Sequence, residues 1–293
     1  MSTSPYLDQL SNIAPEEMIM SNLQNTYVLG HADQELDRLT IQARILEPST
    51  RQLLQEAGIR PGMRVLDIGC GSGDVSFLAA SLVGPAGRVV GVDLAAAAVR
   101  RATGRARSAN LNNVSFVEGD PSDMEFTNRF DAIVGRLVMM YLPNPVEALQ
   151  KLVRHLHPGG VIVIQEIDMA SSRSMPPSPL FEQCLRWVSQ TLHKTGARIR
   201  MGLELHSVFV KAGLPAPFLR LDAAIGGGDD NPVFTAVAEA VRSLLPAMEK
   251  LKVATAWEVG AEDLEHRLRQ EIGGNGGTVA YPSMIGAWAR IAA

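Results

Sequence analysis

The clearest pattern along the chain is an alternation between short apolar runs and segments with helical spacing. A first apolar run at 64–69 is followed by a glycine-rich turn and by apolar residues at helical spacing over 74–83. Further strand-like runs and helical patterns then alternate, at 87–93, 95–109, 114–118, 130–135, 145–156 and 160–166. Strands separated by helices pair in parallel through right-handed crossovers. The sequence therefore predicts an α/β fold with an open, doubly wound, mainly parallel sheet.

Upstream of this alternation, apolar residues recur at helical spacing over 31–47 and are followed by Pro48. Proline has no backbone N–H and disfavours a helical residue before it. We therefore expect one helix to end at Pro48 and a second to cover 50–57. Glu35, Arg38 and Gln42 lie three and four residues apart and form a polar stripe on the first helix. A solvated face and a ligand contact are both open for this stripe.

Beyond residue 170 the alternation changes. Helical patterns cover 180–194 and 203–212, and strand patterns cover 218–226 and 278–291, the second interrupted at Pro282. The residues between these two strands hold two apolar stripes at helical spacing, which predict a helical insertion packed on the core. Such an insertion could also cover a substrate. The predicted division of the chain is a helical segment at 1–60, an α/β core at 61–225, an insertion at 226–277 and a closing strand at 278–293.

Composition narrows the functional classes. The formal net charge is −4, whereas nucleic-acid-binding proteins usually carry a clustered basic surface. One basic cluster is interpreted as the solvated face of a helix, with a docking patch as the alternative. Its members are Arg100, Arg101, Arg105 and Arg107. Cys70 and Cys184 lie far apart in the sequence, as is typical of a reducing compartment. No apolar run approaches the ~18 residues of a membrane span. We expect a cytoplasmic protein that binds neither nucleic acid nor membrane.

The glycine turn carries the chemistry. Asp67 precedes glycines at 69, 71 and 73, giving D-x-G-x-G-x-G, which is neither a dinucleotide fingerprint nor a P-loop. Glycines leave the backbone N–H groups open to a ligand. The turn, together with VVGVDL at 89–94, VEGD at 117–120, FDAIVGRLVMMYLPNP at 130–145 and LHPGGVIVIQE at 156–166, resembles the class I S-adenosylmethionine-dependent methyltransferases. The resemblance covers about residues 25–170.

This resemblance implies S-adenosylmethionine as cofactor, an N-terminal helical lid, and an antiparallel hairpin of the last two strands at the sheet edge. The implied cofactor-binding residues are Tyr27, Arg38, Asp67, Gly69, Gly71, Gly73, Asp93, Leu94, Asp120 and Arg136. Asp93 would accept the ribose hydroxyls, although it could instead cap a helix. Asp120 would take the adenine amino group or merely cap a turn, and Pro121 cannot donate the N–H that the family commonly uses there. Arg136 would pair either with the cofactor carboxylate or with Glu166.

Methyl transfer is an in-line displacement, so the protein mainly aligns the reactants. A base matters only when the acceptor must lose a proton. Glu166 and Asp168 are candidates at the end of the fifth strand, and His31, His193 and His206 have suitable intrinsic pKa values. Of these, Glu166, His206 and His31 are the predicted catalytic residues. Met140 and Tyr141 could border the acceptor, with core packing as the alternative for Met140.

The functional prediction is a monomeric or homodimeric methyltransferase of secondary metabolism that acts on a small lipophilic metabolite. Oxygen is the expected methyl acceptor, with nitrogen and carbon open. No metal is expected, because no metal-ligand motif occurs. The alternatives are a non-catalytic S-adenosylmethionine-binding module and a nicotinamide-dependent oxidoreductase. The second alternative would require a dinucleotide fingerprint that the sequence lacks.

Overall fold

The computed structural model describes residues 33–228 and 230–292, with side chains described from residue 41 onward. Its main feature is a seven-stranded sheet with the order β3-β2-β1-β4-β5-β10-β7. The strands are β1 (Arg64–Ile68), β2 (Arg88–Asp93), β3 (Val114–Glu118), β4 (Phe130–Arg136), β5 (Leu156–Asp168), β7 (Phe218–Asp222) and β10 (Ser283–Arg290). Strands β1 to β5 pair in parallel, and β10 runs antiparallel to both β5 and β7. The predicted doubly wound sheet with an antiparallel edge pair is confirmed.

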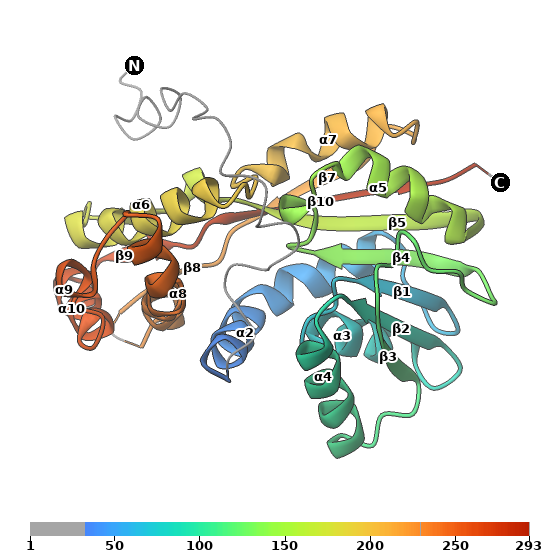
Figure 1. Ribbon diagram of the computed structural model, residues 1–293, viewed down its shortest axis with the longest axis horizontal. Coiled ribbons are helices and arrows are strands. Elements are labelled where there is room, and N and C mark those ends of the chain that lie inside the picture. The colour runs from blue at the N-terminus through green and yellow to red at the C-terminus, as the bar shows by residue number, and fades with distance from the viewer. Residues whose placement is uncertain (1–32, 229, 293) are drawn as a thin grey trace.

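Helices cover both faces of this sheet (Figure 1). One face carries α2 (Asp33–Glu56), α3 (Asp74–Val83) and α4 (Ala96–Ser108), and the other carries α5 (Pro145–Leu152) and α7 (Met201–Lys211). Short 3₁₀ turns are η1 (Met139–Tyr141), η2 (Val153–His155), η3 (Met169–Ser171) and η4 (Gly273–Asn275). Helix α5 begins with a proline, and the Asn144 side chain before it accepts a hydrogen bond from the Glu147 N–H.

Helix α2 differs from the sequence prediction. It runs unbroken through Pro48, so the expected stop at this residue is wrong. Pro48 is exposed, and the hydroxyls of Ser49 and Thr50 donate to the carbonyl of Leu46 in the turn around it. The apolar stripe also continues across the proline, with Leu46 and Leu53 both buried. Tertiary packing of one continuous stripe therefore outweighs the local cost of the missing N–H.

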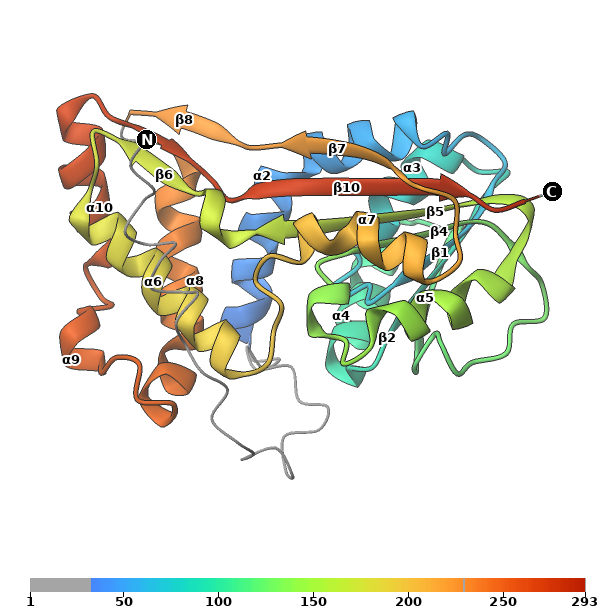
Figure 2. The same cartoon turned by 90° about the horizontal axis from the view of Figure 1, so that it is seen from above.

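A second group of elements stands beside the main sheet (Figure 2). Its base is a three-stranded antiparallel sheet, β6-β9-β8, formed by β6 (Arg173–Met175), β8 (Ile225–Gly227) and β9 (Thr278–Ala280). Its helices are α6 (Pro179–Lys194), α8 (Pro232–Lys250), α9 (Ala256–Val259) and α10 (Leu264–Ile272). Helix α8 packs against α6, α10 and α2. We call this group the helical unit.

The helical unit explains the apolar stripes of the insertion. Phe234, Val241, Leu264 and Leu268 are all buried in the same hydrophobic core, which confirms that the stripes are core contacts. Strands β9 and β10 are separated at Tyr281 and Pro282, the break predicted from the proline. The sequence did not reveal that 173–194 would join the unit, because β6 has three residues and no periodic pattern. No described helix is long and apolar enough to cross a bilayer.

Candidate active site

The glycine turn follows β1 at the carboxyl edge of the parallel strands. Gly69, Gly71 and Gly73 have φ values of 60°, 53° and 91°, a region that residues with a Cβ rarely adopt. A Cβ on Gly69 would lie 2.4 Å from Cγ2 of Val138, whereas a Cβ on Gly71 would meet nothing within 4 Å. The turn is thus packed on its inner side and open at Gly71. Helix α3 starts directly after it, with Gly73 rather than Asp74 at the cap position.

Asp93 at the end of β2 is joined to this turn. Its Oδ2 accepts the Gly71 N–H at 2.8 Å, and its Oδ1 accepts the Ala95 N–H at 2.9 Å. The second bond satisfies an N–H at the start of α4, so the capping role and a ligand role can coexist. A carboxylate has about four acceptor positions, and two remain for ribose hydroxyls. The next residue, Leu94, is 60% exposed, which places an apolar surface beside this carboxylate.

Asp67 lies beneath the turn rather than on its open side. It is buried and accepts a hydrogen bond of 2.5 Å from the hydroxyl of Ser76 on α3. Burial raises the pKa of Asp67 to about 7, partly offset by the Ser76 hydrogen bond and by the charge of Arg136. Burial also raises the pKa of the neighbouring Cys70 thiol, which keeps it protonated and poorly nucleophilic.

Asp120 occupies the turn after β3. It is exposed, and its Oδ1 accepts both the N–H of Ser122 at 2.8 Å and its hydroxyl at 2.7 Å. Ser122 is therefore engaged with Asp120 and is not free to replace the N–H that Pro121 lacks. The geometry corresponds to the turn-capping alternative, although the second carboxylate oxygen remains available to a ligand. The role of Asp120 toward adenine stays a prediction.

Arg136 ends β4 and points toward α2. Its Nη1 donates to Oγ1 of Thr50 at 3.0 Å, and that hydroxyl also lies 2.7 Å from Oε1 of Gln165. Strand register explains why Arg136 and Gln165 reach the same hydroxyl. The two residues pair in register on neighbouring strands, so their side chains point to the same face of the sheet. Burial lowers the pKa of Arg136, and the charges of Asp74 and Asp67 oppose that shift. No carboxylate forms an ion pair with Arg136 in the described part of the chain.

Glu166 lies on the opposite face. Its side chain is fully buried, and its Oε1 accepts the N–H groups of Val138 at 2.9 Å and Met139 at 2.7 Å. Its Oε2 is buried without a hydrogen-bond partner. Burial raises the pKa of Glu166 to about 8, so the side chain is mainly protonated at neutral pH. Glu166 holds η1 in place, and this geometry argues against a general base. It also argues against pairing with Arg136, which was one of the two alternatives for that arginine.

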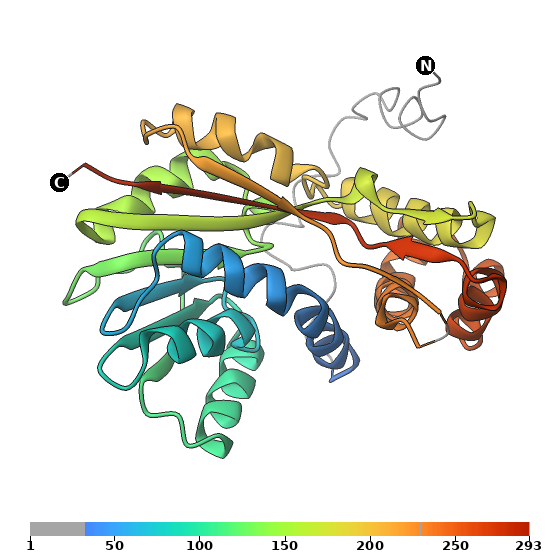
Figure 3. The same ribbon diagram turned by 180° about the vertical axis from the view of Figure 1, so that it is seen from behind.

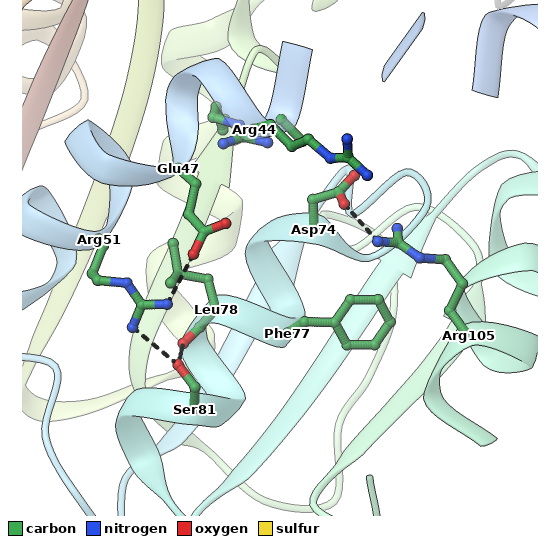
Figure 4. A pocket seen from close by; sticks show the side chains of 10 residues that line it. Arg44, Glu47, Arg51, Asp74, Phe77, Leu78, Ser81 and Arg105 are labelled. Carbon is green, nitrogen blue, oxygen red and sulfur yellow. Dashed lines mark hydrogen bonds and ion pairs between the residues drawn. The ribbon is translucent and has the colours of Figure 1, made fainter. Parts of the chain in front are cut away.

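A cavity of about 330 Å³ opens between α2 and α3, next to the glycine turn (Figure 4). Arginines line much of it, namely Arg44, Arg51, Arg105 and Arg136. Two of them form ion pairs: Arg51 pairs with Glu47 at 3.0 Å, and Arg105 pairs with Asp74 at 2.9 Å (Figure 4). Arg105 also donates to the Ser72 carbonyl at 2.7 Å and stacks over Phe77. The interpretation of Arg105 as part of a solvated face is thus wrong, since this arginine braces the turn.

Several predicted residues either lie away from this cavity or have no described side chain. Tyr27 and His31 fall outside the described residues, and Arg38 belongs to α2 but its side chain is not among those described. His206 and His193 are exposed on α7 and α6, and neither lines the cavity. Asp168 is buried, and its Oδ1 accepts from the Ala170 N–H and from Arg200. Met140 is buried in the core, which matches the packing alternative.

The site also contains residues that the sequence did not reveal. Thr50 was overlooked because Pro48 was expected to end the helix, although positions 43, 46, 50 and 53 continue one helical face. Tyr281, in the break between β9 and β10, accepts a hydrogen bond of 3.1 Å from Gln42 on α2. Its proximity to Pro282 at a strand break was the only sequence signal.

The residues of this candidate site lie mainly within a domain that matches a known protein family. A family of proteins described as having a methyltransferase domain matches residues 59–213, just over half of the chain. The chain belongs to this family. S-adenosylmethionine is the cofactor of this methyltransferase domain, and the match spans the glycine turn, Asp93, Asp120 and Arg136. Within residues 33–228 and 230–292, no three His, Cys, Asp or Glu side chains gather as metal ligands.

Relatives and solved structures add two facts about this methyltransferase domain. Demethylmenaquinone methyltransferase from several Staphylococcus aureus strains is 31% identical over 134 residues, or 45% of this chain and 52% of the relative. The chain thus spans about half the length of the curated relatives it matches. The YcgJ protein of Bacillus subtilis shares the fold at 16% identity, with a TM-score of 0.56, over 84% of this chain and 99% of its own.

Two further structures show how widely this fold is used. Phosphoethanolamine N-methyltransferase 2 of Haemonchus contortus, in complex with S-adenosylmethionine, has a TM-score of 0.53 at 17% identity, over 87% of this chain and 57% of its own. The [4+2]-cyclase SpnF has a TM-score of 0.53 at 19% identity, over 84% of this chain and 80% of its own. The fold therefore does not determine the acceptor, and even the reaction type needs evidence from the site.

Proposed function

We propose that this chain transfers the methyl group of S-adenosylmethionine to a small lipophilic acceptor, with oxygen as the accepting atom. The observation that carries the proposal is the hydrogen bond from the Gly71 N–H of the open glycine turn to Asp93, inside a matched methyltransferase domain. In this arrangement the Gly71 backbone approaches the methionine end, Asp93 accepts the ribose hydroxyls, and exposed Leu94 covers the adenine. The name of the demethylmenaquinone methyltransferase relatives supports a lipophilic acceptor.

The reaction is a displacement at the methyl carbon. A lone pair of the acceptor forms the new bond as the methyl–sulfur bond breaks, and the sulfonium becomes the neutral thioether of S-adenosylhomocysteine. The protein contributes alignment and exclusion of water. Arg136 would pair with the cofactor carboxylate, because its described partner is the uncharged Thr50 hydroxyl and it lines the cavity beside the turn. Of the predicted residues without described side chains, Tyr27 and Arg38 would bind the cofactor and His31 would be a catalytic residue.

The acceptor would lie under the helical unit. Helix α2 packs against both α3 and α8, and its Gln42 donates a hydrogen bond to Tyr281 in the break between β9 and β10. This contact supports a role for the unit in choosing the acceptor, with α6 and α8 as its cover. The buried, unpaired Cys70 and Cys184 support a cytoplasmic place of action.

The experiment is methyl transfer from labelled S-adenosylmethionine to three matched acceptor sets: phenols, primary amines and quinol-like carbon nucleophiles. We expect label in an organic-soluble product from the phenol set, with stoichiometric S-adenosylhomocysteine. Asp93→Ala should strongly reduce the signal when S-adenosylmethionine is not saturating. Label in the amine or carbon set would contradict the oxygen assignment alone. No transfer to any set, with normal S-adenosylhomocysteine binding, would contradict the enzyme and favour a non-catalytic binding module.

A further inference from the structure

The outer edge of the main sheet is apolar and unpaired. Strand β7 is last in the sheet order, and no described strand lies beyond it. Phe218 is 70% exposed, Leu219 51%, Leu221 65%, and Ile225, at the start of β8, 71%. Figure 2 shows β7 and β8 running along the same outer rim, and Figure 3 shows this rim from behind. A free edge strand with exposed apolar side chains is a template for pairing with another strand.

The usual protections of an edge strand are weak here. β7 has the sequence FLRLD, with no proline and no lysine, and it pairs with β10 without a register shift. Its two charged residues satisfy each other on one face: Arg220 donates to Asp222 at 2.6 and 2.9 Å, and also to Glu56 of α2 at 2.6 Å. The other face, which carries Leu219 and Leu221, is left apolar.

We propose that β7 pairs antiparallel with β7 of a second copy of this chain, across a twofold axis at Leu221. A twofold axis perpendicular to the sheet lets a residue face its own copy, so only a few registers are possible. With Leu221 opposite Leu221 of the second copy, Arg220 faces Asp222 of that copy and Asp222 faces its Arg220. A shift of the axis to residue 220 would place two arginines opposite each other. Opposite charges stabilise directly facing strand pairs and like charges destabilise them.

The strand sequence is therefore self-complementary, which is the reason to choose a second copy over another partner. In the chosen register, Arg220 keeps its own Asp222 and gains that of the second copy, forming a closed cluster of alternating charges. On the opposite face, Leu221 packs on its copy and Leu219 faces Ala223. Two seven-stranded sheets would thus join into one continuous sheet, and the exposed leucines would leave water.

Sedimentation equilibrium over a concentration series tests the dimer with four proteins. The wild type should dimerise. Leu221→Lys should be monomeric, because it places two ammonium groups at the axis. Arg220→Asp should raise the dimer dissociation constant by about tenfold or more. The matched control is Leu203→Lys, an exposed leucine on the solvent side of α7, which should leave dimerisation unchanged. All four should bind S-adenosylhomocysteine normally, which shows that they are folded.

Charge exchange and cross-linking test the register. Arg220→Asp combined with Asp222→Arg should restore dimerisation. Leu221→Cys should form a disulfide-linked dimer under mild oxidation, because facing residues of antiparallel strands lie ~4.5–5.5 Å apart at Cα. Leu219→Cys should not, since its facing residue is Ala223. A monomeric wild type, or a dimer that survives Leu221→Lys, would overturn the proposal. Equal cross-linking of the two cysteine variants would overturn the register.

Discussion

The side chains of Arg136 and Glu166 lie on opposite faces of the sheet, although their strands are neighbours. Arg136 pairs in register with Gln165, so the residue after Gln165 must point the other way. Glu166 consequently binds the backbone of η1, and Arg136 reaches Thr50 on α2. A one-residue offset in strand register thus leaves the half-buried Arg136 guanidinium facing the cavity instead of the Glu166 carboxylate.

The first prediction concerns cofactor choice. S-adenosylhomocysteine should raise the melting temperature, because a ligand at a hundred times its dissociation constant stabilises the folded state by ~2.7 kcal/mol. Nicotinamide dinucleotides at the same concentration should not, since the turn is not a dinucleotide fingerprint. Thermal unfolding with each ligand is the measurement. Equal shifts from both ligand types would disagree with the assigned cofactor.

The second prediction concerns Asp93. Asp93→Ala removes the acceptor for the Gly71 N–H and the proposed partner of the ribose hydroxyls. Hydrogen bonds to a charged group contribute ~1.5–3 kcal/mol, so affinity for S-adenosylhomocysteine should fall by about tenfold to a hundredfold. Titration calorimetry measures it. The control is Glu118→Ala. Glu118 is an exposed acid on β3 that pairs in register with Asp93, and this variant should bind S-adenosylhomocysteine with unchanged affinity.

The third prediction separates a carboxylate partner from general destabilisation. Arg136→Met should weaken S-adenosylhomocysteine binding by about tenfold or more, because a charge-assisted pair is lost. Binding of methylthioadenosine, which lacks the amino-acid carboxylate, should change little in the same variant. Arg107→Met, an exposed arginine of α4 away from the cavity, is the matched control. A similar loss for both ligands would show that Arg136 acts only through the fold.

The fourth prediction uses the raised pKa of Glu166. An unfolded glutamate loses its proton near ~4.3, whereas burial in the folded chain raises the pKa to about 8. Between these values the folded state binds the extra proton, so stability contributed by this group falls as pH rises from ~4.3 to about 8. Glu166→Gln cannot release a proton and should remove this part of the slope.

Urea unfolding of the wild type and Glu166→Gln at pH 5, 6, 7 and 8 measures the effect. The wild type should lose more stability with rising pH, and the difference in slope should approach ~1.4 kcal/mol per pH unit. Asp67, with its own raised pKa, is common to both proteins and cancels. Parallel curves would mean that Glu166 is ionised in the folded state throughout this range.

The sequence was most informative where local pattern and tertiary structure agree. The apolar runs predicted the parallel strands, and the apolar stripes of the insertion predicted helices that pack on the core. The glycine spacing identified the cofactor turn, because those φ values are open mainly to glycine.

The sequence was least informative where tertiary packing determines the end of a helix or the direction of a side chain. Pro48 is tolerated because one buried stripe continues past it, and Glu166 is buried because of strand register. The spacing of residues along the sequence reveals neither the register of two strands nor a contact with a distant residue such as Tyr281. The orientation of Asp67, under the turn instead of above it, likewise depends on the Ser76 hydroxyl of the next helix.

The three-stranded sheet at the base of the helical unit limits which segments of the chain can be exchanged between relatives. Its three strands come from 173–175, 225–227 and 278–280, and the middle strand, β9, is contributed by the last of these segments. Exchange of residues 226–277 between relatives would transplant α8, α9 and α10 without α6 and without two of the three strands of this base. If the unit selects the acceptor as we propose, a recombination event that moves acceptor preference intact must carry nearly the whole second half of the chain. Point substitution within the unit would then be the more accessible route to a new acceptor.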